Sequence, residues 1–169
     1  MNFFDGHSMS IDDKTRQLIA SYLGRAPRGL QEVAAWYNDE PAVVRVASMV
    51  DQKPFPTMYW LVHPKINYEI DKLEANGLIA LLQQKVDADP ELQQAMAEDH
   101  ARYIEARRDF MDEATIAEIN SKNLAGAFEG RGIGGIADTS RIRCLHTWYG
   151  AHLVMPNTIG NLLSPYLKV

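Results

Sequence analysis

The stretch PAVVRVASMVDQKPFPTMYWLVH, residues 41–63, decides the fold class, because the regular segments around it read as helices. Residues 41–50 are rich in β-branched side chains, and residues 57–63 form a second apolar run that ends before Pro64. The turn-forming segment DQKPFP separates the two runs, so the pattern predicts an antiparallel hairpin with a long loop. Two strands alone are marginally stable in water, and we therefore expect helices or another chain to cover them.

The segment before this hairpin is predicted to be helical. Side-chain oxygens between Ser10 and Asp13 can cap the first turn of a helix, and Gly24 is a typical C-terminal stop. After a proline turn, residues 30–37 (LQEVAAWY) are predicted to form a second, short helix. Residues 1–10 are expected to be a flexible N-terminus.

Helical patterns also follow the hairpin as far as residue 153. Pro90 suits the first turn of the longest helix, and Asp89 can cap it. Another helix is expected over about residues 139–153, after a glycine-rich loop, and the tail beyond it is expected to be irregular. The predicted fold class is α+β: a mostly helical single domain over residues 11–169 with a small antiparallel hairpin or sheet.

Composition argues against several functional classes. The chain has 169 residues, of which 46% are hydrophobic and 23% charged, as in soluble globular domains. Its net charge of −5 disfavours a broad nucleic-acid surface, and no stretch approaches the ~20 apolar residues of a membrane span. The single cysteine, Cys144, permits no internal disulfide. We therefore expect a cytoplasmic protein with neither a nucleic acid nor a membrane as partner.

The stretch GRGIGGIADTSRIRCLHTWYGAH, residues 130–152, gathers residue types that bind or react. Its glycines fit G-x-G-x-x-G, but the dinucleotide-binding fingerprint needs a preceding strand, and here the preceding segment reads as helix. Glycine amides ahead of a helix can instead hold an anion, unless Asp138 takes that position as the helix cap. Both interpretations stay open.

Cys144, His146 and His152 form the pattern C-x-H-x₅-H, and thiolate and imidazole suit zinc or iron. Within one helix only residues three or four apart share a face, so these three cannot ligate one ion together from a helix. One of them could join a distant ligand such as His63, or Cys144 and His146 could precede the helix. The other interpretation is a buried His152 whose ring is satisfied by a carbonyl or carboxylate group.

Basic side chains fall within the apolar stripe of the longest helix. His100 and Arg107 lie beside Tyr103 on that stripe, and a buried arginine needs a partner, because an unpaired charge in the interior costs several kcal/mol. The partner can be an acidic residue, water reached past the stem, or the carboxylate or phosphate of a ligand. Arg25 and Arg28 flank the proline turn, and their planar guanidinium groups suit the same anions, although paired surface arginines are often simply solvated.

Several segments also resemble a bacterial family known as domain of unknown function 501. They are GRAPRG, EPAVVRVASMVDQKPFPTMYWLVHP, DHARYIEAR, GIGGIADTSRIRCLHTWYGAHL and PNTIGNLL, and the resemblance covers about residues 23–163. The family has no established activity to carry over. Many members look as if they carry cysteine where this chain has His63, an exchange that a metal ligand or a buried position would tolerate.

Three functions from different classes fit these observations. In the first, a small-molecule enzyme or binding protein has a pocket between the hairpin, the longest helix and the helix after the glycine-rich loop, and it holds a small anionic molecule. The predicted catalytic residues are Cys144, His146 and His152, as nucleophile and as proton donors or acceptors. The predicted ligand-binding residues are Arg25, Arg28, His100, Tyr103, Arg107, Gly132, Gly134, Gly135 and Asn157.

The second function is a zinc or iron site, with ligands drawn from His63, Cys144, His146 and His152. The third is an interaction module in which the hairpin and the stretch FPTMYWL, residues 55–61, dock a partner or a second copy as a homodimer. In that case the polar residues are structural.

Overall fold

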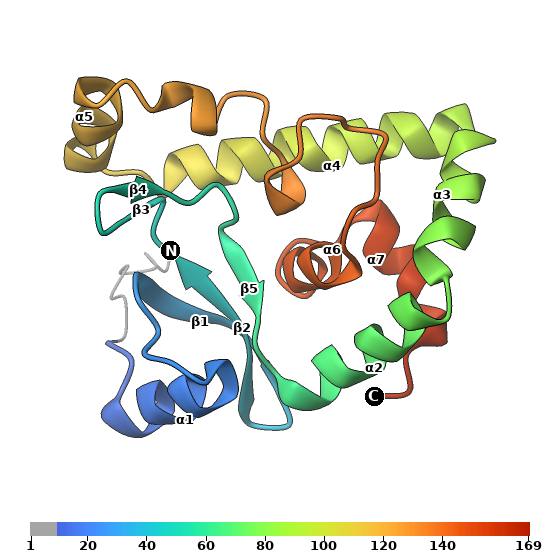
Figure 1. Ribbon diagram of the computed structural model, residues 1–169, viewed down its shortest axis with the longest axis horizontal. Coiled ribbons are helices and arrows are strands. Elements are labelled where there is room, and N and C mark those ends of the chain that lie inside the picture. The colour runs from blue at the N-terminus through green and yellow to red at the C-terminus, as the bar shows by residue number, and fades with distance from the viewer. Residues whose placement is uncertain (1–9) are drawn as a thin grey trace, which may run out of the picture.

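A small antiparallel sheet and an arch of helices face each other across a central helix in the computed structural model, which describes residues 10–169 (Figure 1). The expected flexible N-terminus concerns residues 1–10, of which 1–9 lie outside the described part. The sheet has the order β1–β2–β5, with strands β1 (Leu30–Tyr37), β2 (Glu40–Val46) and β5 (Tyr59–Leu61). The arch consists of α2 (Pro64–Ala75), α3 (Leu78–Asp87) and α4 (Pro90–Asp109). The predicted class, mostly helical α+β with a small antiparallel sheet, is confirmed.

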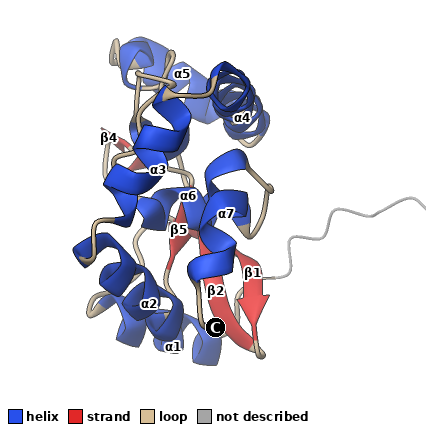
Figure 2. Cartoon of the chain, turned by 90° about the vertical axis from the view of Figure 1, so that its right-hand side faces the viewer, coloured by secondary structure: helices blue, strands red, loops and turns tan. Residues whose placement is uncertain are grey.

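The remaining helices occupy the two ends and the middle of the molecule. α1 (Asp13–Leu23) packs on the sheet, and α5 (Glu113–Ser121) extends the arch beyond α4. α6 (Leu145–His152) runs inside the arch, between β5 and α7 (Thr158–Leu163), as Figure 1 shows. Figure 2 shows the same helices and strands from the side. Predicted caps are found where expected: Asp89 accepts from the amide of Glu91, and Gly24 adopts a left-handed conformation after α1.

The segment LQEVAAWY is a strand, β1, so the helix predicted there is wrong. Asn38 and Asp39 both have positive φ (48° and 63°) and form the two-residue turn that suits a hairpin, placing Tyr37 opposite Glu40 of β2. Eight residues of mixed polarity fit either periodicity, and pairing with β2 decided the outcome. The predicted antiparallel pairing across the long loop is confirmed, with Val43 opposite Leu61. The loop holds a further hairpin, β3 (Met49–Val50) and β4 (Lys53–Pro54).

The C-terminal third also differs from the prediction in two places. Residues 139–144 are not helical, because Gln83 of α3 binds the carbonyl of Ser140 and the amide of Ile142 (both 2.9 Å). The tail is not irregular, because Asn157 caps α7 by accepting from the amide of Gly160 at 2.7 Å. The first change comes from a side chain that reaches across the fold, and the second from a cap within its own segment.

α6 is the centre of the larger apolar core. Leu145 and Trp148 have no exposed surface, and Gly150 lies so close to β5 that a Cβ there would be 3.2 Å from the amide nitrogen of Leu61. The sequence predicted that either helices or another chain would cover the hairpin. A helix of the same chain, α6, covers it. A smaller core, which includes Ile19 and Val44, joins α1 to the sheet.

Arg107 ties two irregular segments to α4. Its side chain is 2% exposed, and its guanidinium donates to the carbonyls of Pro56, Phe128 and Arg131 at 2.8 Å each. The prediction of a buried arginine is confirmed. The expected partners were acidic groups, water or a ligand anion, and the structure supplies main-chain oxygens instead.

Replacing Arg107 with methionine (R107M) is expected to lower the free energy of unfolding by about 3 kcal/mol or more, because the carbonyls of Pro56 and Arg131 lose this donor and the carbonyl of Phe128, which also accepts from the amide of Arg131, loses one of two. Urea unfolding followed by circular dichroism measures this change. The matched control is Arg108→Met, at the exposed neighbouring position, with an expected change within about 0.5 kcal/mol. Equal stability of the two variants would contradict the structural role.

Candidate functional site

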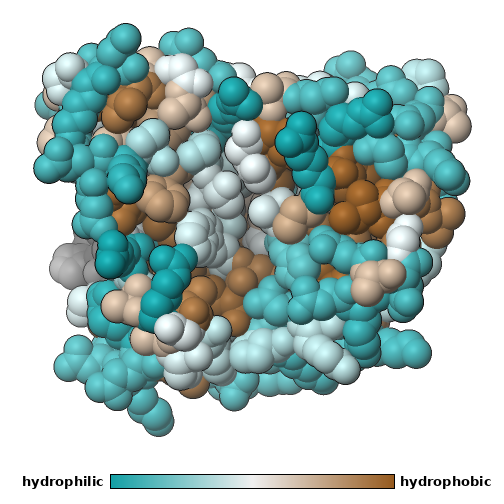
Figure 3. All heavy atoms as spheres, viewed as in Figure 1, coloured by the Kyte–Doolittle hydropathy of each residue, from teal (hydrophilic) through white to brown (hydrophobic). Residues whose placement is uncertain are grey.

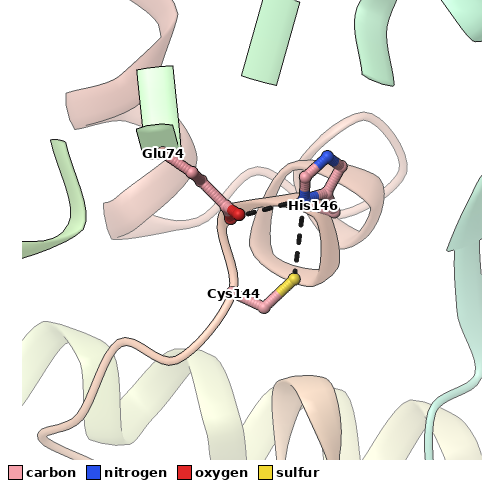
Figure 4. Close-up of side chains that lie close together, drawn as sticks. All are labelled: Glu74, Cys144 and His146. Carbon is pink, nitrogen blue, oxygen red and sulfur yellow. Dashed lines mark hydrogen bonds and ion pairs between the residues drawn. The ribbon is translucent and has the colours of Figure 1, made fainter. Parts of the chain in front are cut away.

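Three polar side chains converge at the N-terminus of α6 (Figure 4). Cys144 precedes the first turn with an extended backbone (φ −150°, ψ 120°), and its Sγ lies 3.7 Å from Nδ1 of His146. Glu74 of α2 places Oε1 3.3 Å from the same nitrogen. One of the alternatives left open by the sequence, that Cys144 and His146 precede the helix, holds for Cys144 alone, since His146 is the second residue of α6. The extended backbone of Cys144 brings its thiol to the imidazole two residues later.

Glu74 lies at this position because the first amides of a helix lack partners within the helix. The side chain of Cys144 caps none of them, and the amide of Leu145 donates to Oε1 of Glu74. Asp71, one turn earlier on α2, places its carboxylate 3.0 Å from Nε2 of His146. Both ring nitrogens of His146 therefore face acidic groups.

The charges of the cluster reinforce one another. The hydrogen bond with Cys144, together with the nearby charges of Glu74 and Asp71, raises the pKa of His146 to about 9. Burial by itself raises the pKa of the Cys144 thiol, but the hydrogen bond with His146 and the backbone of Thr147 bring it below the usual value. A helix N-terminus also favours the thiolate. These effects favour a thiolate beside an imidazolium.

The cluster borders a groove between α6 and β5. His146 and Thr147 form one wall, Thr57 and residues 59–61 form the other, and the groove has a volume of about 280 Å³. Figure 3, drawn in the view of Figure 1, shows a hollow in the middle of this face, lined largely by residues of intermediate hydropathy. A small molecule in this groove would contact His146, whose side chain is 23% exposed.

Two of the four predicted metal ligands lie elsewhere. His63 precedes α2, where its Nε2 lies 3.0 Å from Oε2 of Glu40. His152 ends α6, about 12 Å along the axis from Cys144, and its Nδ1 accepts from the amide of Asn157. The prediction that these histidines share one ion with Cys144 is therefore corrected, because they lie in different parts of the fold.

Three predicted ligand-binding residues have structural partners instead. His100 and Tyr103 are 1% and 2% exposed: Nδ1 of His100 accepts from the amide of Ile133, and the Tyr103 hydroxyl accepts from the amides of Met58 and Tyr59. Asn157, also 2% exposed, caps α7 and donates to the carbonyl of Trp148. The predicted inward orientation of His100 and Tyr103 is confirmed, but their polar atoms bind the protein's own backbone.

The glycine-rich loop also has a packing role. The amides of Gly132 and Gly135 donate to the carbonyls of Ile136 and Gly132, so neither is free to bind an anion. Gly134 has φ 71°, and a Cβ there would lie 2.8 Å from the Thr147 hydroxyl oxygen. Close approach to His100 of α4 accounts for Gly132, and close approach to Thr147 of α6 accounts for Gly134, whereas Gly135 has a φ of 70° and lies beside Pro56. Asp138 does not cap α6 but accepts from Ser140 within a turn.

The three arginines predicted to share an anion do not line one pocket. Arg25 and Arg28 border a cavity between α1 and the sheet, whereas Arg107 faces a different cavity between α4 and α5. The predicted common pocket is therefore wrong. Conversely, Asp71 and Glu74 were not anticipated. Their spacing of three residues places them on one helix face, but nothing in the sequence distinguishes these two among the 22 acidic residues of the chain.

Comparison with known proteins identifies one family. A family model described as "Protein of unknown function (DUF501)" matches residues 33–164. No curated protein and no solved structure matches the chain. Within residues 10–169, none of the helices combines the length and the apolar character that crossing a bilayer requires.

Replacing Gly132 with alanine is expected to lower the free energy of unfolding by about 2 kcal/mol or more. The new Cβ would lie 2.1 Å from Nδ1 of His100, whose ring is held by the amide of Ile133 and by packing against Trp148. Thermal unfolding measures the loss. Gly126→Ala is the control, because a Cβ there meets nothing within 4 Å, and a comparable loss in both variants would contradict the packing role.

Proposed function

The chain belongs to the DUF501 family, and we propose that it binds one Zn²⁺ ion through Glu74, Cys144 and His146. One observation carries the proposal: a carboxylate oxygen, a thiol sulfur and an imidazole nitrogen lie within 4.8 Å of one another. These are the three donor types that zinc sites in proteins use. They come from two elements, α2 and the start of α6, whose relative position is set by the core.

The separations of the donors support a tetrahedral ion. Typical zinc–sulfur, zinc–nitrogen and zinc–oxygen bonds imply edges of about 3.6 Å between sulfur and nitrogen and about 3.4 Å between nitrogen and oxygen. The observed separations are 3.7 Å from Cys144 to His146 and 3.3 Å from His146 to Glu74. Two of the three edges therefore already match a tetrahedral ion, and the third, between the sulfur of Cys144 and the carboxylate oxygen of Glu74, is within 4.8 Å.

Asp71 supports the same proposal from outside the ligand set. A histidine that ligates a metal through one nitrogen commonly donates from the other to a carboxylate, which fixes the ring and its tautomer. Asp71 at Nε2 leaves Nδ1 of His146 to the ion.

Three protein ligands leave a fourth position for water or substrate, as in catalytic zinc sites. Zinc lowers the pKa of bound water to about 7 and so supplies a nucleophile at neutral pH. The groove beside His146 and Thr147 would hold the substrate. Metal-assisted hydrolysis of a small molecule is the reaction class that this arrangement favours.

Protein purified without a histidine tag and reconstituted with Zn²⁺ is expected to retain about one ion per chain after gel filtration, measured by plasma mass spectrometry. Cys144→Ser and Glu74→Gln should each lose most of it, and Asp71→Asn should weaken zinc binding about 10- to 100-fold in chelator competition. His152→Gln is the control, because this histidine lies at the other end of α6. Undiminished zinc in Cys144→Ser, or none in the wild type, would refute the site.

A second candidate is a cysteine nucleophile, favoured by the order of groups Cys144, His146 and Asp71. The thiol lies 3.7 Å from one ring nitrogen, and the other nitrogen lies 3.0 Å from the carboxylate. A nucleophile, a base and a group that orients the base recur in this order in covalent catalysis. In this case Glu74 serves as the cap of α6, and the thiolate adds to a substrate carbonyl carbon while the π electrons of the carbonyl move to its oxygen. The groove is lined by His146 and not by Cys144, so the substrate has to extend past His146 to meet the thiolate. The predicted interaction module and homodimer stay predictions, since one chain does not test them.

Iodoacetamide labelling separates the two candidates, because Cys144 is the only cysteine. For a zinc ligand, labelling of the zinc-loaded protein is expected to be slow and to accelerate about tenfold or more after chelation. For a nucleophile, labelling at neutral pH is fast with or without added zinc, and His146→Gln slows it about tenfold or more. Slow labelling under all these conditions would leave the cluster as the cap of α6 and contradict both.

A further inference from the structure

A second cavity lies between the end of α1, the loop of residues 24–29 and the sheet, and it contains none of the proposed zinc ligands. Its volume is about 200 Å³. Val44, Val46 and Val50, at most 8% exposed, are among the apolar side chains that line it. For comparison, an apolar cavity of about 150 Å³ in another protein holds benzene, so an aromatic ring fits a space of this size.

Cationic side chains also border this cavity. Three exposed basic residues line it: Arg25, Arg28 and Lys53. The lining has one acidic residue, Asp51, although the protein as a whole has a net charge of −5. Arg28 pairs with Asp51 at 3.0 Å, but both side chains are more than 60% exposed, and such surface pairs contribute little. Arg25 lies over the indole of Trp60, 5.6 Å from the ring centroid. Positive charge therefore surrounds an apolar interior.

The loop that carries the arginines is held in place. Gly29 has φ 69°, and a Cβ there would lie 2.3 Å from a methyl group of Val50, so only glycine allows this approach. Its carbonyl accepts from the amide of Ala47 at 2.8 Å, and Pro27 restricts the turn. A ligand would thus meet cationic groups on a backbone that is already ordered, which lowers the entropic cost of binding.

We propose that this cavity binds a small organic anion with a flat apolar body and a carboxylate or phosphate group. The body packs on the valines and on the indole of Trp60, and the anionic group lies among Arg25, Arg28 and Lys53. Guanidinium groups match the planar oxygen pairs of both anions, so charge and shape favour this class over neutral aromatics. The proposal does not depend on the zinc site, although Trp60 also borders the groove beside α6.

The proposal is tested by nuclear magnetic resonance titration of chelator-treated protein. The chemical shifts of the backbone amides of Val44 and Val50 report binding, because both residues line this cavity and neither lines the groove beside α6. Phenyl phosphate and phenylacetate are the probes, and the tighter of the two identifies the anionic group. Both should give saturable shifts, and the double variant Arg25→Gln/Lys53→Gln should bind about tenfold or more weakly. Arg16→Gln, an exposed arginine of α1 outside the cavity, should bind as the wild type does.

Benzyl alcohol tests the charge, and inorganic phosphate tests the apolar body. Both should bind at least about tenfold more weakly than phenyl phosphate. Equal binding of benzyl alcohol would overturn the role of the cations, and equal binding of inorganic phosphate would overturn that of the valines. No saturable shift at about 10 mM of either aromatic anion would overturn the site itself. The titration is repeated on Cys144→Ser, whose unchanged affinity would show that the zinc ligands take no part.

Discussion

The structure depends on a short helix that begins inside the protein. α6 has eight residues, its Leu145 and Trp148 are fully buried, and Gly150 brings its backbone against Leu61 of β5. Water cannot satisfy the first amide of such a helix, so another part of the fold must. Glu74 does this from α2, and the arch of helices has to pass close enough to α6 for its carboxylate to reach Leu145.

This capping requirement explains why one carboxylate is present, but not why the cluster holds four titratable groups. A carboxylate alone would satisfy the amide of Leu145. Around the imidazole of His146 lie two carboxylates and a thiol that its hydrogen bond favours as thiolate, and of these Glu74 and Cys144 are partly buried whereas Asp71 is exposed. Negative charge therefore exceeds positive charge in the cluster. A divalent cation held by Glu74, Cys144 and His146, as proposed, would offset that excess, and this charge argument agrees with the donor geometry.

The basic residues show that burial of a cationic side chain does not by itself indicate a ligand site. Arg107 is buried, and loops that lack regular main-chain pairing supply the three carbonyls that bind it. Arg25 and Arg28 are exposed, and the backbone that carries them is constrained around an apolar cavity. An inward-facing cation in a helical pattern is therefore weak evidence for a ligand, because backbone carbonyl oxygens of irregular segments can satisfy its donors instead.

Local chemistry in the sequence determined the features that depend on neighbouring residues alone. Asp89 and Pro90 start α4, and Gly24 follows α1. The two apolar runs on either side of the turn-rich loop pair with each other as β2 and β5. Tertiary structure decided what depends on distant partners. LQEVAAWY became a strand because β2 pairs with it, residues 139–144 stayed outside the helix because Gln83 binds them, and the short helix that Asn157 caps locally is held by the burial of Ile159 in the core. The candidate site divides in the same way: Cys144 and His146 are neighbours in sequence, but Glu74 and Asp71 join them only because α2 and α6 pack together. Spacing along a chain specifies the groups within one turn of each other, whereas convergence of separate elements is set by how their apolar faces pack.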